Sequence, residues 1–191
     1  MTQKTFTELA LRTESRPEAL QNLTKQEVLE LLGVMIAAGA AIDTAKRAIF
    51  YGKPLDKEKI CSELSTLSAK AIDLLGLIKD GDATLTGEHH APNLRLLHAT
   101  LGIFGEAGEL AEALEKQMLT GELDMVNVSE ELGDADWYKQ IGHDETGVSE
   151  ADVRAKIIAK LQKRYPEKFT SEAAHNRDLA AERTALEGTT A

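Results

Sequence analysis

The composition and the spacing of apolar residues predict an all-α fold. Alanine, leucine, glutamate and lysine abound, aromatic residues make up only 4% of the chain, and it contains four prolines. Helix formers therefore dominate and helix breakers are rare. Apolar residues recur at steps of three and four, which is the period of an amphipathic helix. We expect a helical bundle that forms one domain over residues 1–191, because a chain of this length suits a single core.

The N-terminal part of the chain predicts a helical hairpin over residues 24–79, preceded by a short helix over residues 5–13. Thr24 and Glu27 have the spacing of a capping box, which predicts that a long helix begins there. A second helix is expected over residues 56–79, followed by a turn-rich linker. The candidate core of the first helix is a set of apolar residues at helical spacing: Val28, Leu31, Leu32, Met35, Ile36, Ile42 and Ile49.

A second hairpin is expected over residues 93–141, and its two helices carry carboxylates at matched spacing. Glu106 and Glu109 are three apart in the first helix, and Glu131 and Asp134 repeat that spacing in the second. Positions three apart lie on one face of a helix. If the two helices are antiparallel neighbours, four carboxylates converge.

Four carboxylates at one site imply a bound cation. Like charges a few ångströms apart repel, and a divalent ion removes that repulsion. Oxygen ligands without cysteine suit Mg²⁺ or Mn²⁺ rather than zinc. His98 lies on the same stripe of the first helix, where a structural or orienting role is expected rather than direct ligation. The alternative is that the acids form a solvated helix face.

The two hairpins resemble each other in sequence. Shifting one onto the other aligns three pairs of residues: Gly52 with Gly121, Asp56 with Asp124, and Glu63 with Glu131. In this frame alanines stand where Glu106 and Glu109 are. Residues 24–79 are thus interpreted as a degenerate hairpin that completes a four-helix arrangement around residues 93–141. Chance similarity between amphipathic hairpins is the other interpretation.

The C-terminal part, residues 149–187, predicts further helices. Ser149 and Asp152 have the spacing of a helix N-terminus. The helix that follows carries the densest group of cations in the chain: Arg154, Lys156, Lys160, Lys163 and Arg164. A triphosphate needs such a group near its metal site, although a solvated basic face is the alternative. The last helix is too polar to stand alone, so we expect it to dock on the bundle or on a second subunit.

The charge of the chain excludes some partners. A net charge of −10 and a sequence pI near 5.0 argue against binding nucleic acid or an anionic membrane by bulk electrostatics. Cys61 is the single cysteine, which fits a reducing compartment. The N-terminal sequence has no apolar signal region, and the apolar run over residues 31–42 is too short to span a bilayer. We expect a soluble, cytoplasmic protein.

Two motifs together resemble the all-α nucleoside triphosphate pyrophosphohydrolases, the MazG-like group. Gly105-Glu-Ala-Gly-Glu-Leu followed by Glu130-Glu-Leu-Gly-Asp matches the E-x-x-E, then E-x-x-D, signature of that family. The resemblance continues through Lys160-Leu-Gln-Lys-Arg-Tyr-Pro and Asn176-Arg-Asp, and so covers roughly the C-terminal half of the chain. It implies a four-helix core with extra N- and C-terminal helices.

The resemblance also implies an activity. Such a hydrolase cleaves a nucleoside triphosphate, or its deoxy form, between the α- and β-phosphates and releases the monophosphate and pyrophosphate, which controls nucleotide pools. Four residues are expected to be both catalytic and metal-binding, with Mg²⁺ as the ion: Glu106, Glu109, Glu131 and Asp134. Five are expected to bind the substrate: Tyr138, Lys160, Arg164, Asn176 and Arg177. Glu106 is the candidate base. A homodimer is expected, with a tetramer as the alternative.

Two other classes of protein share some of these features. A carboxylate-bridged di-iron bundle has an acidic interior, but it needs Glu-x-x-His on two helices. Here Glu109 and Asp134 stand at the histidine positions. A non-catalytic helical interaction module would carry the same acids on its surface. The burial of Glu131 and Asp134 separates that alternative from an enzyme.

Overall fold

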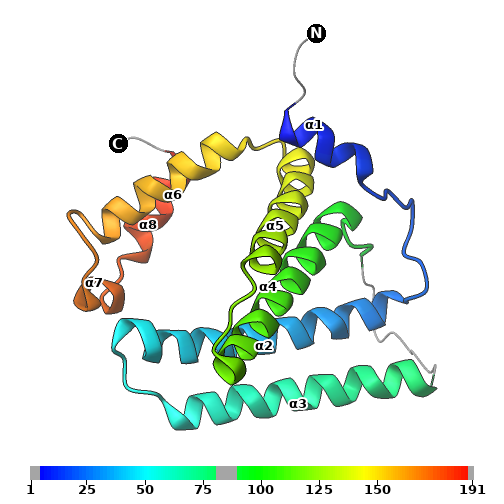
Figure 1. Cartoon of the computed structure of the whole chain (residues 1–191), viewed down its shortest axis with the longest axis horizontal. Helices are drawn as coiled ribbons and strands as arrows, with labels where there is room; N and C mark the ends of the chain where they lie inside the picture. The colour runs from blue at the N-terminus through cyan, green and yellow to red at the C-terminus, as the bar shows by residue number, and fades with distance from the viewer. Residues whose placement is uncertain (1–4, 81–89, 189–191) are drawn as a thin grey trace. The chain divides into compact units, whose positions relative to one another are not determined.

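The computed structural model of the chain describes residues 5–80 and 90–188, and these residues form helices joined by loops, without a strand (Figure 1). This confirms the all-α prediction. The elements are α1 (Phe6–Ala10), the short 3-10 helix η1 (Leu11–Thr13), α2 (Lys25–Tyr51), α3 (Lys57–Asp80), α4 (Leu94–Thr120), α5 (Met125–Thr146), α6 (Glu150–Arg164), α7 (Ser171–His175) and α8 (Leu179–Glu187). The linker expected between the two hairpins, including His89, lies mainly outside the described residues.

Contacts within the chain divide it into two compact units. The first comprises Met1–Lys25 and Thr86–Val148, and therefore contains α1, η1, α4 and α5. The second comprises Gln26–Leu85 and Ser149–Ala191, with α2, α3, α6, α7 and α8. One domain over residues 1–191 stays a prediction.

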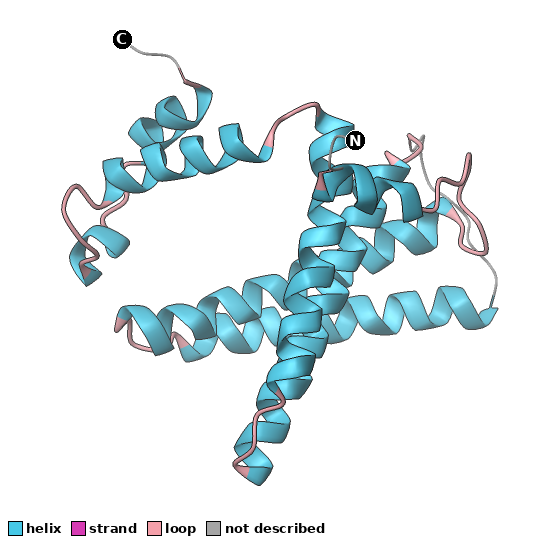
Figure 2. Ribbon diagram, turned by 45° about the horizontal axis from the view of Figure 1, so that its top comes forward, coloured by secondary structure: helices cyan, strands magenta, loops and turns pink. Residues whose placement is uncertain are grey.

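The first unit is built on the hairpin of α4 and α5, which run side by side (Figure 2). The side chain of Asn93 accepts a hydrogen bond from the backbone N–H of Leu96 and so caps the start of α4. Gly121 ends that helix at φ 82°, a left-handed conformation that favours glycine. Asp124 then caps α5. These local signals turn the chain sharply, and the two acid-bearing helices become neighbours.

A close contact sets how α4 and α5 meet. The ring of Tyr138 on α5 lies against Gly102 on α4, where a Cβ would overlap it. Next to it, the Trp137 indole N–H donates a hydrogen bond of 3.1 Å to the carbonyl oxygen of Ala10. Thr7 donates a hydrogen bond of 2.6 Å to the Gln140 side chain. The contact of Tyr138 with Gly102 therefore holds α5 against α4, and the hydrogen bonds of Trp137 and Gln140 hold the N-terminal segment against α5.

The second unit contains the hairpin of α2 and α3, and α6 with α8 beside it (Figure 2). Lys70 on α3 forms an ion pair of 2.9 Å with Glu30 on α2, and its aliphatic stem lies over Gly33. Ser149 caps α6 by accepting from the backbone N–H of Asp152, as its spacing predicts. The α6–α8 pair is held by ion pairs to Glu182 that are described with the candidate site.

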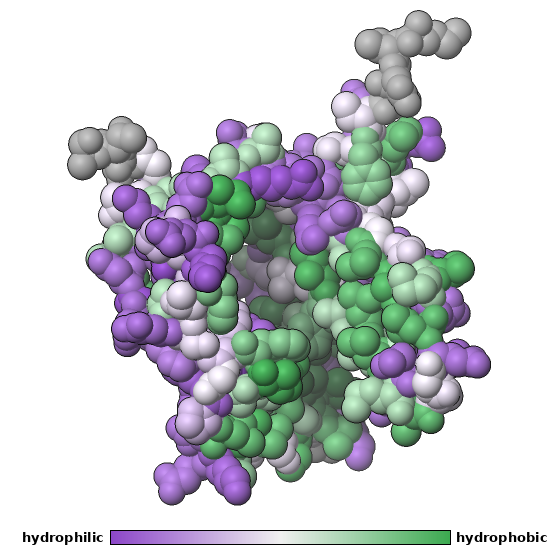
Figure 3. Space-filling view, turned by 60° about the vertical axis from the view of Figure 1, so that its left-hand side comes forward, coloured by the Kyte–Doolittle hydropathy of each residue, from purple (hydrophilic) through white to green (hydrophobic). Residues whose placement is uncertain are grey.

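The predicted core of α2 is only partly correct. Val28 is buried, but the side chains of Ile36, Ile42 and Ile49 are exposed, at 73%, 61% and 71%. The buried residues of α2 are otherwise small: Ala37, Ala41 and Thr44. A helix that is apolar nearly all round does not reveal from its sequence which face a neighbour covers. Figure 3 shows hydrophobic areas on one face of the molecule, and exposed apolar residues occur on other helices as well as on α2.

By length and composition, α2 could cross a membrane. It has 27 residues, and its most apolar stretch has a mean hydropathy of 1.7. The apolar run over residues 31–42 is by itself too short to span a bilayer. The helix that contains it, α2, continues on both sides of that run. Core helices of soluble proteins and signal sequences meet the same criteria, so this property alone does not assign α2 to a membrane.

Candidate metal and active site

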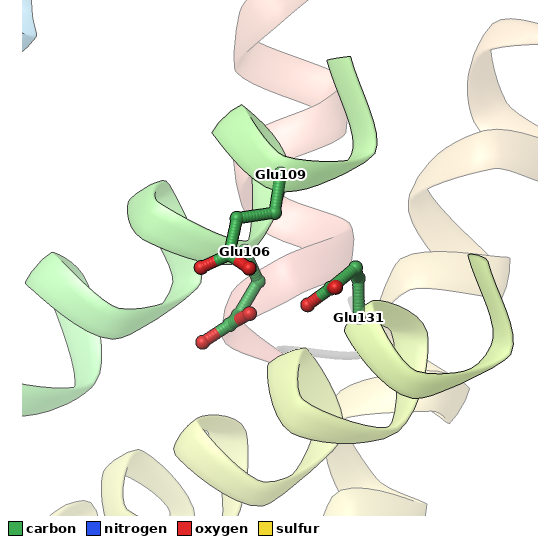
Figure 4. Close-up of side chains that lie close together, drawn as sticks. All are labelled: Glu106, Glu109 and Glu131. Carbon is green, nitrogen blue, oxygen red and sulfur yellow. The ribbon is translucent and has the colours of Figure 1, made fainter. Parts of the chain in front are cut away.

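Three glutamates from the two helices of the first unit converge. Glu106 and Glu109 lie on α4, and Glu131 lies on α5. One carboxylate oxygen from each lies within 4.8 Å of the other two. Figure 4 shows the three side chains directed toward one another from the two helices. The i, i+3 spacing on α4 puts two acids on one face, and the hairpin brings the third to them.

The cluster combines burial with like charge. Glu106 is 9% exposed and Glu131 is 4% exposed, whereas Glu109 is open to solvent. Burial, a hydrogen bond with Glu131 and the charge of Glu109 raise the pKa of Glu106 to about 7. The charge of Glu131 is the main cause that raises the pKa of Glu109. Such a cluster is relieved by a proton or by a cation.

Asp134 borders this cluster and is exposed, so of the two acids whose burial separates an enzyme from an interaction module only Glu131 is buried. It is not one of the three residues whose oxygens lie within 4.8 Å of one another. Its charge nevertheless raises the pKa values of Glu106, Glu109 and Tyr138, which places it near them. The pKa of the Tyr138 hydroxyl is raised mainly by burial. Tyr138 therefore stands beside the acids, as its position on α5 predicts.

These residues fit a divalent metal ion. The donors are carboxylate oxygens, which are the ligands that Mg²⁺ and Mn²⁺ prefer. Two of the three are buried, so their charges are less screened by water than those of a solvated helix face. His98 does not belong to the cluster. Its ring packs edge-on against Trp137 and Tyr138, with ring centroids 5.9 Å and 5.5 Å apart, which agrees with a structural role.

Glu131 has a side-chain partner that the sequence did not predict. The side-chain amide of Asn127 donates a hydrogen bond to the Glu131 Oε1 atom. Asn127 lies four residues earlier on α5, and this spacing on a helix was the available signal. The amide fixes one oxygen of Glu131 and orients the carboxylate.

The remaining predicted site residues belong to the second unit. The guanidinium groups of Arg164 and Arg177 both donate to Glu182, at 2.5 Å and 2.6 Å for the shortest contacts. Glu182 is 4% exposed, and its sequence context in a polar helix gave no signal of this role. Lys160 lies one turn before Arg164 on α6, and Asn176 follows the end of α7. The structure thus brings Arg164 and Arg177 together, and their role in substrate binding stays a prediction.

Comparison with known families adds one finding. Residues 96–169 match the model of the MazG nucleotide pyrophosphohydrolase domain. The matched stretch includes the three converging glutamates, Asp134, Tyr138, Lys160 and Arg164, and it ends before Asn176. Over these residues it confirms the resemblance seen in the sequence. No curated protein and no solved structure shows a significant match to the chain.

Proposed function

From the MazG nucleotide pyrophosphohydrolase domain at residues 96–169, we propose that this protein is a Mg²⁺-dependent hydrolase of nucleoside triphosphates. The reaction releases a nucleoside monophosphate, or its deoxy form, and pyrophosphate, and its role is to control nucleotide pools. The observation that carries the proposal is the convergence of Glu106, Glu109 and Glu131 inside the matched stretch. Two separate helices supply these acids, and two of the three are buried.

The proposed ligands of the metal are the three converging glutamates together with Asp134. Mg²⁺ bound by these residues would neutralise charge on the phosphate oxygens and would favour attack by water at the α-phosphorus. Mn²⁺ has the same preference for oxygen donors and is the expected substitute. Asn127 has a positioning role, because its amide orients the Glu131 carboxylate.

Glu106 is the proposed base. It is the most confined of the α4 acids, and its carboxylate lies against that of Glu131. A base must lie within hydrogen-bond reach of the attacking water, and a buried carboxylate beside the metal ligands meets that requirement. Tyr138, which stands beside the acids, is proposed to contact the substrate.

The phosphates of the substrate are proposed to contact Lys160, Arg164, Asn176 and Arg177. The support is the family resemblance, and for Lys160 and Arg164 also their position inside the matched stretch. One guanidinium group can donate two parallel hydrogen bonds to a phosphate, and such bonds would stabilise the negative charge of the departing pyrophosphate.

A homodimer is the proposed assembly, and a tetramer is the alternative. The end of the α4–α5 hairpin exposes several large apolar side chains, among them Met118 at 83%, Leu119 at 80% and Val126 at 79%. Neighbouring exposed apolar residues of this kind commonly mark a protein interface. Size-exclusion chromatography with light scattering measures this directly.

The experiment that tests the activity uses the purified chain with Mg²⁺ and each common NTP and dNTP separately, with products resolved by ion exchange. Monophosphate and pyrophosphate from a subset of substrates would support the proposal and identify the preferred nucleotide. Diphosphate and phosphate would contradict it, because a different bond would then be cleaved. Glu106→Ala should abolish turnover, whereas Glu115→Ala, an exposed acid on the same helix, should retain it.

A further inference from the structure

A cationic cavity lies in the second unit, between the C-terminal end of α2 and the region of α6 and α7. Its volume is about 110 Å³. Five of its lining residues carry a positive charge: Lys46, Arg47, Lys53, Arg164 and Arg177. One molecule occupies about 30 Å³ in liquid water, so this volume holds roughly three or four waters, which is enough for one phosphate-sized anion.

The ion pairs around the cavity leave an excess of positive charge. Asp43 pairs with both Lys46 and Arg47, at 2.7 Å and 2.6 Å. On the other wall, Glu182 pairs with two arginines in the same way. Each acid thus neutralises one of its two cations. The Lys53 ammonium adds a further charge, and it has no ion pair within the described part of the chain.

The two walls of the cavity are held together by aromatic rings. Tyr51 at the end of α2 lies against Phe169, with ring centroids 5.7 Å apart, and Phe169 lies 5.4 Å from Tyr165. The Arg164 guanidinium in turn lies over the Tyr165 ring. Ion pairs hold four of the five cations before any ligand arrives, and Lys53 is the exception. A bound anion would therefore meet a largely prepared site.

A second cavity of about 340 Å³ adjoins the first. The two share Arg47, Lys53 and His175 as lining residues. The larger cavity is also lined by Thr44 and Asp56, which offer hydroxyl and carboxylate oxygens for polar contacts. A ligand with a phosphate group in the small cavity could therefore place the rest of its structure in the larger one.

We propose that the paired cavities at the end of α2 bind a small molecule through its phosphate group. Lys and Arg are the usual partners of phosphate. The chain carries a net charge of −10, so five cations around one cavity form a local positive region on an acidic protein. The ligand class is a phosphate-bearing metabolite, with either a nucleoside monophosphate or free inorganic pyrophosphate as its source. Two of the five cations, Arg164 and Arg177, are also proposed above to contact the substrate's phosphates, and to that extent the inference rests on the proposed function. It adds Lys46, Arg47 and Lys53, which lie outside the matched stretch.

Calorimetric titration of the full chain in EDTA tests this proposal, because chelation removes any binding through a metal ion. Pyrophosphate and each nucleoside monophosphate are titrated separately. We expect saturable binding of at least one of them. Lys53→Ala should weaken it about tenfold or more, since a charged hydrogen bond is lost. Lys79→Ala is the matched control, because it removes the same charge from an exposed position of the same unit that lines neither cavity.

The outcomes are distinct. Tighter binding of a monophosphate identifies a nucleotide site, whereas tighter binding of pyrophosphate identifies an anion site. Either result supports the proposal if Lys53→Ala weakens the binding. No saturable binding, or binding that Lys53→Ala leaves unchanged, overturns the proposal. Equal loss in Lys53→Ala and Lys79→Ala also overturns it, since general charge attraction would then explain the affinity. Circular dichroism of Lys53→Ala verifies that the variant is folded.

Discussion

Glu106 on α4 and Glu131 on α5 hold carboxylate oxygens within 4.8 Å of each other although both residues are almost completely buried. Two such groups destabilise the fold unless a proton or a cation lies between them. The protein therefore keeps an arrangement that costs stability in the absence of metal, which is typical of a site built to bind a cation.

Magnesium should accordingly stabilise the fold. A ligand that binds only the native state contributes about 2.7 kcal/mol when its concentration is a hundred times its Kd. We expect Mg²⁺ to raise the Tm of the wild type and to have little effect on Glu131→Gln. The same variant should be more stable than the wild type in EDTA, because one buried charge is removed. Differential scanning calorimetry measures both effects. An equal Mg²⁺ response in the two proteins would rule out Glu131 as a ligand.

Asn127 should determine metal affinity without being a ligand. Its amide holds the Glu131 carboxylate in place, and partners of this kind typically account for about a ten- to hundredfold difference in affinity. We expect Asn127→Ala to weaken Mg²⁺ binding within that range while the protein stays folded. Titration calorimetry with Mg²⁺ measures the change. Unchanged affinity would show that Glu131 needs no orientation.

Because Tyr138 lies against Gly102, Gly102→Ala should lower the free energy of unfolding. A methyl group at Gly102 would overlap the Tyr138 ring, and overpacking of this kind costs about 1–3 kcal/mol. Gly105→Ala is the matched control on the same helix, because a Cβ there meets nothing within 4 Å. That change should instead stabilise the fold by about 0.5–1 kcal/mol, as alanine is the better helix former. Urea unfolding distinguishes the two variants.

The Glu182 cluster should make stability depend on pH in the acid range. Hydrogen bonds from Arg164 and then Arg177 lower the pKa of Glu182 from its ordinary value of 4.5 to about 2. Because the folded-state pKa is the lower one, the stabilisation is complete above pH 4.5 and is lost as the pH falls toward 2. We expect Glu182→Gln to cost about 2 kcal/mol at pH 7, because the part-buried Arg164 and the exposed Arg177 lose a charged hydrogen-bond partner, and to remove this part of the pH dependence.

Glu187→Gln is the control for that measurement. Glu187 pairs with Arg183 on the exposed side of α8, and exposed pairs contribute about 0–1 kcal/mol. Its unfolding free energy should follow that of the wild type from pH 7 to pH 3. If the two variants behave alike, the Glu182 cluster has no special role in stability.

The sequence predicted the parts of this protein that depend on local signals. The i, i+3 spacing of Glu106 and Glu109 on α4 is a property of neighbouring residues, and it predicted that these two acids share a face. The sequence predicted that four carboxylates converge, whereas three lie within 4.8 Å of one another and Asp134 is not among them. The family motifs over residues 105–110, 130–134 and 160–166 lie inside the matched stretch, whereas Asn176-Arg-Asp lies outside it.

Features that depend on contacts distant along the chain were not predictable in this way. The sequence of α2 is apolar on several faces, so it could not show that Ile36 and Ile42 are exposed while Ala37 and Ala41 are buried. Glu182 pairs with Arg164, eighteen positions earlier, and no periodic pattern links the two residues. Tertiary packing determines such contacts, and the helical spacing of residues along the sequence does not predict how helices pack.

Anomalous diffraction from crystals soaked in Mn²⁺ locates the metal ion without relying on turnover. We expect an anomalous peak among the carboxylates of Glu106, Glu109 and Glu131, with Asp134 beside it, and no such peak in Glu131→Gln crystals. Manganese bound only elsewhere on the protein, or a peak that persists unchanged in the variant, would contradict this expectation.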